Sequence, residues 1–366
     1  MGKRELLLIL AFAALGVLAY RVTAPPSDAN EEGFSLSRLV RHAMADLRGQ
    51  NATAEVAKNV TVAVPAGVTH LSVRGFSGRL TIVGEDRPDV AVGLSGTIFG
   101  FDEAEARARA DTLKIDVEVE GDAVVLDLEL PEGRRRPRIE VEVALPRRLA
   151  VQVEAEGGRL EVRNVAGVSL DSRRVETTLV DVAGPVTGEQ RDGALEIAGA
   201  GSVDFTSRRT AIRFERISGP IAGEYTDGRL LVREAAGPLT VETRRVSVEL
   251  ESVAGDTKIV STDGRLVLRH QRGALQFEGE RAPLTATFGA AVAVEARSHD
   301  GTIEVTLAPG EGATLDLEAD EGSIRLPQDE TAPTREGRVE RVRTEIDGGG
   351  PAVRVRTTRA NIVVRR

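Results

Sequence analysis

Residues 227–237 are DGRLLVREAAG, and residues 263–273 are DGRLVLRHQRG. Each stretch places an Asp-Gly pair before two apolar residues that are separated by one position, and each ends on glycine. The apolar pair recurs between residues 151 and 273 at steps of 17 or 18 residues. Self-similarity at a fixed period is typical of repeat architectures. The pairs are Leu160/Val162, Thr177/Leu179, Leu195/Ile197, Ile212/Phe214, Leu230/Val232, Val248/Leu250 and Leu266/Leu268.

The period predicts the structure of one repeat. It is too short for a pair of helices and suits one coil of a β-solenoid. A second apolar pair lies about nine residues upstream, as at Val151/Val153 and Leu239/Val241. Two short strands per coil, each directing alternate residues inward, account for both pairs. The sequence therefore predicts an all-β fold, a β-solenoid or β-helix of 17–18-residue coils in which stacking buries what no single coil can bury.

A pattern of charged residues follows the same period. Ten positions before the small residue that closes each coil, the sign of the charge alternates. In a parallel stack these side chains would lie above one another, with each Arg between two Asp, and a slip by one coil would bring like charges together. The alternative is a 35-residue unit of antiparallel hairpins. The predicted structural charge ladder consists of Arg174, Asp192, Arg209, Asp227, Arg245 and Asp263.

The N-terminus has the features of an export signal. Lys3 and Arg4 precede an uncharged stretch from Leu6 to Tyr20, which has the length of a signal-peptide core. A membrane span needs about 20 apolar residues, and Arg21 ends this stretch earlier. We expect an exported protein in the periplasm or at the cell surface. Membrane association through residues 6–20 is expected if the signal remains as an anchor, and cleavage is the alternative.

Composition divides the chain further. A helix at 35–48 either binds a partner or a membrane surface, or covers the first coil. A short helix is predicted at 102–112, and the basic loop 134–138 is either a solvated turn or a grip on an anionic polymer. The expected segments are 1–24, an export signal or membrane anchor; 25–57, a linker with an amphipathic helix; 58–150, an N-terminal β region with a helical insert; 151–326, the regular repeats; and 327–366, a polar loop and the final C-terminal strands.

The repeat continues less regularly after residue 273. Apolar pairs appear at Ala286/Phe288, Ile303/Val305 and Ile324/Leu326. The chain then ends on AVRVRTTRANIVVRR, in which Ile362/Val364 resemble one last rung. The arginines of this segment predict an exposed final strand whose charge prevents edge-to-edge association.

Composition excludes several kinds of chemistry. The chain has no cysteine, which rules out disulfides and thiolate metal sites. The net charge of −9 argues against general nucleic-acid binding, which needs a basic surface. Neither metal-ligand spacing nor a cofactor motif is present, and the Asp300 and His299 side chains are expected to point apart. The four histidines are His42, His70, His270 and His299.

Two chemical alternatives remain to be weighed. Calcium could bind at the Asp-Gly corners, but each Asp faces an Arg and turn formation explains these residues better. Parallel β-helices also include polysaccharide-cleaving enzymes, which need two carboxyl groups across a cleft. The acidic residues occupy regular surface positions instead, and Tyr225 is the only aromatic hydroxyl in the regular repeats. We therefore expect no catalytic, metal or cofactor site.

The chain resembles a known bacterial family. The segments DGRLLVREAAG (227–237), STDGRLVLRHQRG (261–273) and SHDGTIEVTLAPG (298–310) follow the entry sequence VEVALPRRLAVQVEAEGGRLEVRNVAG (141–167). Together they are similar to exported β-strand-repeat proteins called putative adhesins, a domain of unknown function, over residues 60–366. The resemblance implies a solenoid-like fold, an envelope location and no established catalytic residues. This chain departs from the pattern where Arg replaces the Gly-containing turn in alternate coils.

The sequence favours a non-enzymatic cell-envelope protein with an adhesion, scaffold or binding role. Its partner would be an unknown envelope protein or polymer, and not a nucleic acid. Two alternatives remain open: a solenoid carbohydrate-active lyase or glycosidase, and an envelope sensory or regulatory module acting through the helix at 35–48.

Overall fold

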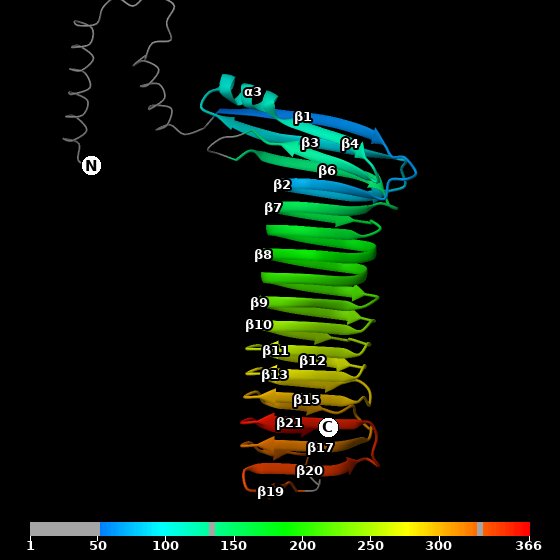
Figure 1. Ribbon diagram of the computed structural model, residues 1–366, viewed down its shortest axis with the longest axis vertical. Helices are drawn as coiled ribbons and strands as arrows, with labels where there is room; N and C mark the ends of the chain where they lie inside the picture. The colour runs from blue at the N-terminus through cyan, green and yellow to red at the C-terminus, as the bar shows by residue number, and fades with distance from the viewer. Residues whose placement is uncertain (1–51, 132–135, 328–331) are drawn as a thin grey trace, which may run out of the picture. The chain divides into compact units, whose positions relative to one another are not determined.

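The computed structural model describes residues 52–131, 136–327 and 332–366. These residues are all-β apart from one helix, and their strands belong to one mixed sheet of 22 strands (Figure 1). The export segment 1–24, the predicted helix 35–48 and His42 lie outside the described residues. The helix is α3 (Glu103–Thr112), and the strands are β1 (Ala52–Ala63), β2 (His70–Glu85), β3 (Asp89–Gly100), β4 (Lys114–Glu120), β5 (Ala123–Glu129), β6 (Arg138–Pro146), β7 (Ala150–Arg163), β8 (Val168–Ile217), β9 (Ile221–Ala235), β10 (Leu239–Glu251), β11 (Thr257–Thr262), β12 (Arg265–Gln271), β13 (Leu275–Glu280), β14 (Leu284–Phe288), β15 (Val294–His299), β16 (Ile303–Thr306), β17 (Ala313–Asp320), β18 (Ile324–Arg325), β19 (Thr334–Glu336), β20 (Val339–Ile346), β21 (Ala352–Thr358) and β22 (Ile362–Arg365).

Successive repeats pair with one another in parallel. Leu239 pairs with Ile221 before it and with Thr257 after it, while Val248 pairs with Leu230 and Leu266. Each repeat thus contributes one strand segment to each of two parallel ladders, at the offset that the sequence repeats. The two apolar pairs of a repeat lie one in each ladder, so the period in the sequence is the period of strand pairing.

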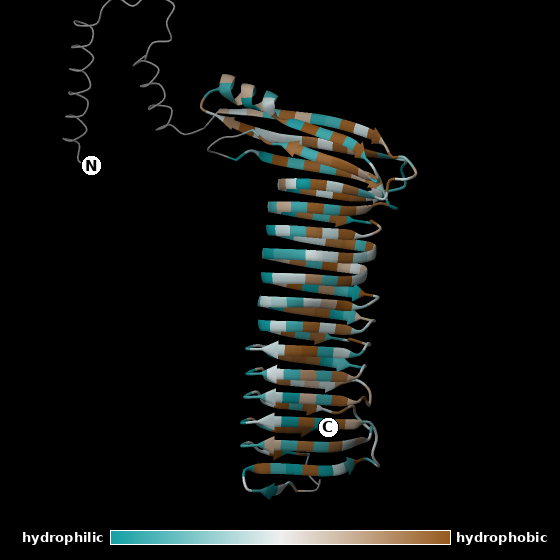
Figure 2. Cartoon of the chain, viewed as in Figure 1, coloured by the Kyte–Doolittle hydropathy of each residue, from teal (hydrophilic) through white to brown (hydrophobic). Residues whose placement is uncertain are grey.

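Alternation along each strand separates the core from the surface. Leu230 is 0% exposed, whereas its neighbour Leu231 is half-buried on the outer face. Apolar and polar residues alternate in the same way along most strands (Figure 2). Because the core is a thin column filled from both ladders, aliphatic side chains occupy most of it. Phe205, Phe214 and Phe277 are its largest fully buried residues.

The corners that join the two ladders use left-handed backbone at non-glycine residues. Asp227 has φ 55° and Arg245 has φ 54°, so the Asp-Gly and Arg-Arg corners share one conformation. Asp tolerates this region better than most residues, whereas Arg pays a steric penalty there. The alternate corners without glycine therefore keep the shape of the Asp-Gly corners.

The opposite corner depends on glycine for close packing. A Cβ on Gly237 would lie 2.2 Å from the carbonyl oxygen of Gly219, and one on Gly255 would lie 2.1 Å from that of Gly237. Contacts this short are never made by real side chains, so the backbones of successive repeats approach closely only where Cβ is missing. This explains why a glycine closes most repeats.

The N-terminal end widens and departs from sequential order. β2 pairs with β7 on one side and with β5 and β6 on the other, while β1 and β3 extend the sheet beyond β6. The predicted helix is confirmed as α3, with Asp102 as its N-cap. β1 begins at Ala52, so the linker that we predicted to end at residue 57 is too long.

The C-terminal end also departs from sequential order. β21 pairs with β15 on one side and β17 on the other, and β22 pairs with β16 and β18. The strands of the chain's end thus lie inside the stack, with β20 and β19 beyond them (Figure 1). The prediction of an exposed final strand is wrong, because β21 and β22 are paired along both edges.

Candidate functional site: the charged corner

The six residues predicted as a charge ladder occupy one corner of successive repeats. Arg208 pairs with Thr226, and Thr226 with Arg244, so the residues that follow them occupy equivalent positions. Each of the six has left-handed backbone, with φ between 53° and 60°. We call this set the charged corner: Arg174, Asp192, Arg209, Asp227, Arg245 and Asp263, continued by Arg281, Asp300 and Arg359.

Asp and Arg of the charged corner form paired-oxygen salt bridges. Nε of Arg209 lies 2.6 Å from Oδ1 of Asp192, and its Nη2 lies 3.0 Å from Oδ2. Arg245 holds Asp227 in the same way, at 2.6 and 2.9 Å. The planar guanidinium matches the two carboxylate oxygens, which makes this geometry specific as well as attractive.

These contacts shift the acidity of both partners. The hydrogen bond from Arg209 is the main cause that lowers the pKa of Asp192 below its ordinary value of 3.8. Arg245 lowers the pKa of Asp227 by the same means, and the bond to Asp192 raises the pKa of Arg209. The charged forms are therefore favoured, so these groups are poorly suited to proton transfer near neutral pH.

The salt bridges join repeats in twos and do not form a continuous chain. Each Arg reaches the Asp of the preceding repeat; within the described part of the chain no ion pair links Arg209 to Asp227 or Arg245 to Asp263. Asp227 acts on Arg209 only through the longer-range field that raises the pKa of the guanidinium. Arg174 lies at the corner but makes no such bridge to Asp192.

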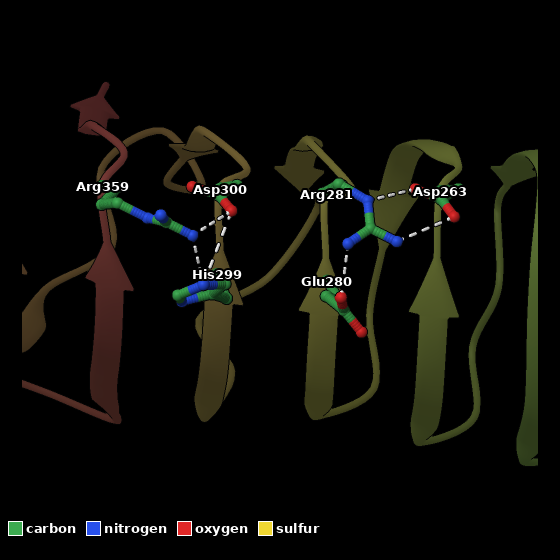
Figure 3. A network of polar contacts seen from close by, with 6 residues as sticks. All are labelled: Asp263, Glu280, Arg281, His299, Asp300 and Arg359. Carbon is green, nitrogen blue, oxygen red and sulfur yellow. Dashed lines mark hydrogen bonds and ion pairs between the residues drawn. The ribbon is translucent and has the colours of Figure 1, made fainter.

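Three residues that the sequence analysis missed extend the corner. Arg281 holds Asp263 at 2.5 and 3.0 Å and also contacts Glu280 at 2.5 Å (Figure 3). Beyond them Arg359 bonds Asp300. The signal for Asp300 was present, because Asp300-Gly301 repeats the Asp-Gly corner, but the insertion that lengthens the repeat there hid the register.

His299 belongs to this network, contrary to our expectation. Nε2 of His299 lies 3.5 Å from Oδ2 of Asp300, and Nη2 of Arg359 lies 2.6 Å from the same nitrogen (Figure 3). The prediction that His299 and Asp300 point apart assumed a continuous strand. The left-handed backbone at Asp300, φ 60°, ends that alternation and brings the two side chains together.

A second network on the outer face was not predicted. Glu215 bonds Arg213 in its own strand, and Arg233 of the next repeat lies 3.8 Å from Glu215 and 3.0 Å from Glu251. The hydrogen bond from Arg213 is the main cause that lowers the pKa of Glu215. Ionic contacts between repeats therefore occur on a face as well as at the corner.

The other predicted positions add no chemical centre. Tyr225 is buried in the core, where loss of solvent raises the pKa of its hydroxyl. His70 lies 3.8 Å from Asp122, and His270 is exposed at the opposite corner. Most of the basic loop 134–138 can be placed only from Arg136 on, and the Arg138 guanidinium lies over the ring of Phe99. Residues 52–131, 136–327 and 332–366 contain no group of three His, Asp or Glu side chains arranged to hold a metal.

No protein-family model matches the sequence, and no curated protein matches it. The chain is similar to solved structures of low sequence identity. One is a putative cell adhesion protein from Clostridium sporogenes, with 12% identity and a TM-score of 0.19, covering 85% of this chain and 99% of that one. Another is a putative adhesin from Parabacteroides distasonis, with 10% identity and a TM-score of 0.30, covering 84% and 97%.

A third solved structure is a putative lipid binding protein from Parabacteroides distasonis, with 11% identity, a TM-score of 0.32, and coverage of 85% of this chain and 97% of that one. The adhesin names agree with the family resemblance drawn from the sequence. Among the residues that can be placed, no helix has the length and apolar character needed to cross a membrane.

Proposed function

We propose that this protein is a non-enzymatic β-solenoid of the cell envelope that presents a rigid, regularly charged surface to a protein or polymer. The observation that carries the proposal is the register of the repeats. Parallel pairing at a constant offset holds surface side chains at strand spacing, about 4.8 Å apart. Such a surface suits recognition of an extended partner, because one binding pattern is repeated along it.

The charged corner and the Glu215 network support binding over catalysis. Glycoside cleavage with two carboxyl groups needs one whose pKa is raised, so that it stays protonated to act as an acid. Asp192, Asp227, Asp263 and Glu215 have their pKa lowered by arginine instead. Their charges are fixed at neutral pH, which favours electrostatic recognition.

Envelope location is part of the proposal and is supported by the signal-like residues 1–24. It is tested by fractionating cells that express the full chain beside a variant that lacks these residues. The full chain is expected in the periplasmic or envelope fraction and the variant in the cytoplasm. The same distribution for both proteins would contradict export.

Binding is tested with a photo-crosslinking amino acid at Leu231, on the outer face, in the full chain expressed in its native envelope. We expect a discrete crosslinked species of defined mass that disappears when Arg213 and Arg233 are both changed to Glu. The matched control places the same crosslinker at Thr226, on the other outer face. Absence of a crosslinked species from both positions would contradict a binding role.

A further inference from the structure

The C-terminal repeat, residues 352–365, lies between two repeats that precede it in the sequence. Residues 353–358 of β21 pair with β15, 59 residues earlier, and the other edge of β21 pairs with β17, 38 residues earlier for Asn361 and Ser323 of the same repeat. We call the space that it fills the C-terminal slot, bounded by residues 294–306 and 313–325.

Backbone bonds hold the C-terminal repeat on both sides. Asp300 N–H donates to Thr358 O at 3.0 Å, and Leu307 N–H donates to Arg365 O at 2.9 Å. On the other side Arg359 N–H donates to Asp320 O at 2.7 Å. The inward residues are fully or almost fully buried: Val353, Val355, Ile362 and Val364. Without this repeat, two strand edges and a section of core would be exposed.

Charge distinguishes the C-terminal repeat from the slot. Residues 352–366 contain five Arg and no acidic residue. Nε of Arg365 lies 2.8 Å from Oε1 of Glu304, and Arg359 bonds Asp300. Arg354 stands in register between Glu295 on one side and Asp316 on the other. The slot therefore selects a cationic strand with alternating apolar residues.

The connector to this repeat is short and rich in glycine. Residues 347–351 are DGGGP, and Asp347, Gly348 and Gly349 all have positive φ, at 49°, 84° and 84°. Glycine allows large changes of backbone direction at small cost. All the strand contacts of the C-terminal repeat are with residues far away in the sequence, so an identical repeat from another molecule could make every one of them.

We propose that the C-terminal slot is a strand-binding site whose second occupant is the C-terminal repeat of another copy of this chain. Exchange of an identical element costs little, because the contacts in the exchanged and closed forms are the same. The tether gives the chain's own repeat a high effective concentration, so the closed monomer prevails when the protein is dilute. Exchange increases with protein concentration whenever the slot is empty, as during folding. This inference is independent of what the protein binds.

The chain has no cysteine, so single cysteines report the exchange directly. His299 and Thr358 are paired residues across the slot edge, and changing them leaves the five C-terminal arginines in place. Full-length His299→Cys and Thr358→Cys proteins, one of them isotope-labelled, are mixed, unfolded with reductant, refolded together and oxidised. We expect a disulfide-linked heterodimer, identified by mass spectrometry, whose yield rises with protein concentration.

The matched control pair is Arg244→Cys with Thr262→Cys, which are paired in the same way between consecutive repeats in the middle of the stack. This pair should give no heterodimer above random collision. A slot pair that gives no more heterodimer than the control overturns the proposal. An independent measurement is the mass of the wild-type chain after refolding at increasing concentration. A doubling is expected, and a monomer at every concentration overturns the proposal whatever the disulfides do.

Discussion

Arg359 and Asp300 are 59 residues apart in the sequence, yet Nη2 of Arg359 lies 2.6 Å from Oδ2 of Asp300. The contact exists because the C-terminal repeat returns to lie beside β15. It continues the pattern of the charged corner, in which an Arg holds the Asp of the adjoining repeat. Elsewhere that Asp is 17 or 18 residues earlier. The corner therefore keeps its chemistry where the order of the chain changes.

Arg359→Ala is expected to loosen the C-terminal repeat locally. It removes the bond to Asp300 and a left-handed residue that neighbouring repeats help to hold. Amide exchange should become faster in β21 and β22 while β10 and β11 stay unchanged. Arg356→Ala is the matched control, since Arg356 stands on the outer face of β21 beside Arg297. Equal acceleration in the two variants would show that the Asp300 contact is not the cause.

The core depends on the inward residue of each apolar pair. Leu230→Ala should lower the free energy of unfolding by about 2–5 kcal/mol, because it removes a fully buried side chain and leaves a cavity. Leu231→Ala, one position away on the outer face, should cost less than about 1 kcal/mol. Urea denaturation of both variants measures the difference. Equal costs would contradict the assigned faces of the strand.

The glycine corner should not tolerate a side chain. Gly237→Ala would place Cβ 2.2 Å from the carbonyl oxygen of Gly219, which forces the two repeats apart. We expect a loss of about 1–3 kcal/mol of unfolding free energy, as is usual for overpacking. Gly67→Ala is the control, because no atom lies within 4 Å of the new Cβ. That variant should stay within about 0.5 kcal/mol of wild type, and an equally unstable Gly67→Ala would refute the steric explanation.

Acid should weaken the charged corner. Asp263 has a pKa of 3.8 when unfolded, and the hydrogen bond from Arg281 lowers the pKa in the folded chain. The unfolded state therefore binds more protons as pH falls through this region. The contribution of Asp263 is complete at about pH 5 and above, and it is lost as pH falls through the folded-state pKa. Urea midpoints measured from about pH 7 down to about pH 3 should fall less steeply for Asp263→Asn than for wild type. Parallel curves would exclude Asp263 as a source of the acid sensitivity.

Charge order at the corner is tested by reversal. Asp263→Arg places a third cation between Arg245 and Arg281, so thermal stability should fall, and more so at low salt because salt screens the repulsion. Adding Arg281→Asp restores an opposite pair in the reverse order and should recover part of the loss. Thermal unfolding at low and high salt measures both effects. A double variant no more stable than Asp263→Arg would show that the pairing itself contributes little.

The sequence by itself determined the repeat and its inward face. A period of 17 or 18 residues, with Leu230 and Val232 in one member and Leu266 and Leu268 two repeats later, fixes which side chains face the core. Strand geometry makes this possible, because alternate residues share a face and parallel pairing preserves the offset. The Asp-Gly corners and the helix at 102–112 were predictable for the same local reasons.

Tertiary structure alone decided the order of the repeats at both ends. Nothing local to Ile362 and Val364 distinguishes a strand on the exposed end from one inserted between β16 and β18, since both expose and bury the same residues. Insertion reflects distant charges, the five arginines of residues 352–366 against acidic residues on either side of the slot. The contact of His299 with Asp300 likewise needed the left-handed corner, a backbone state that neighbouring repeats impose.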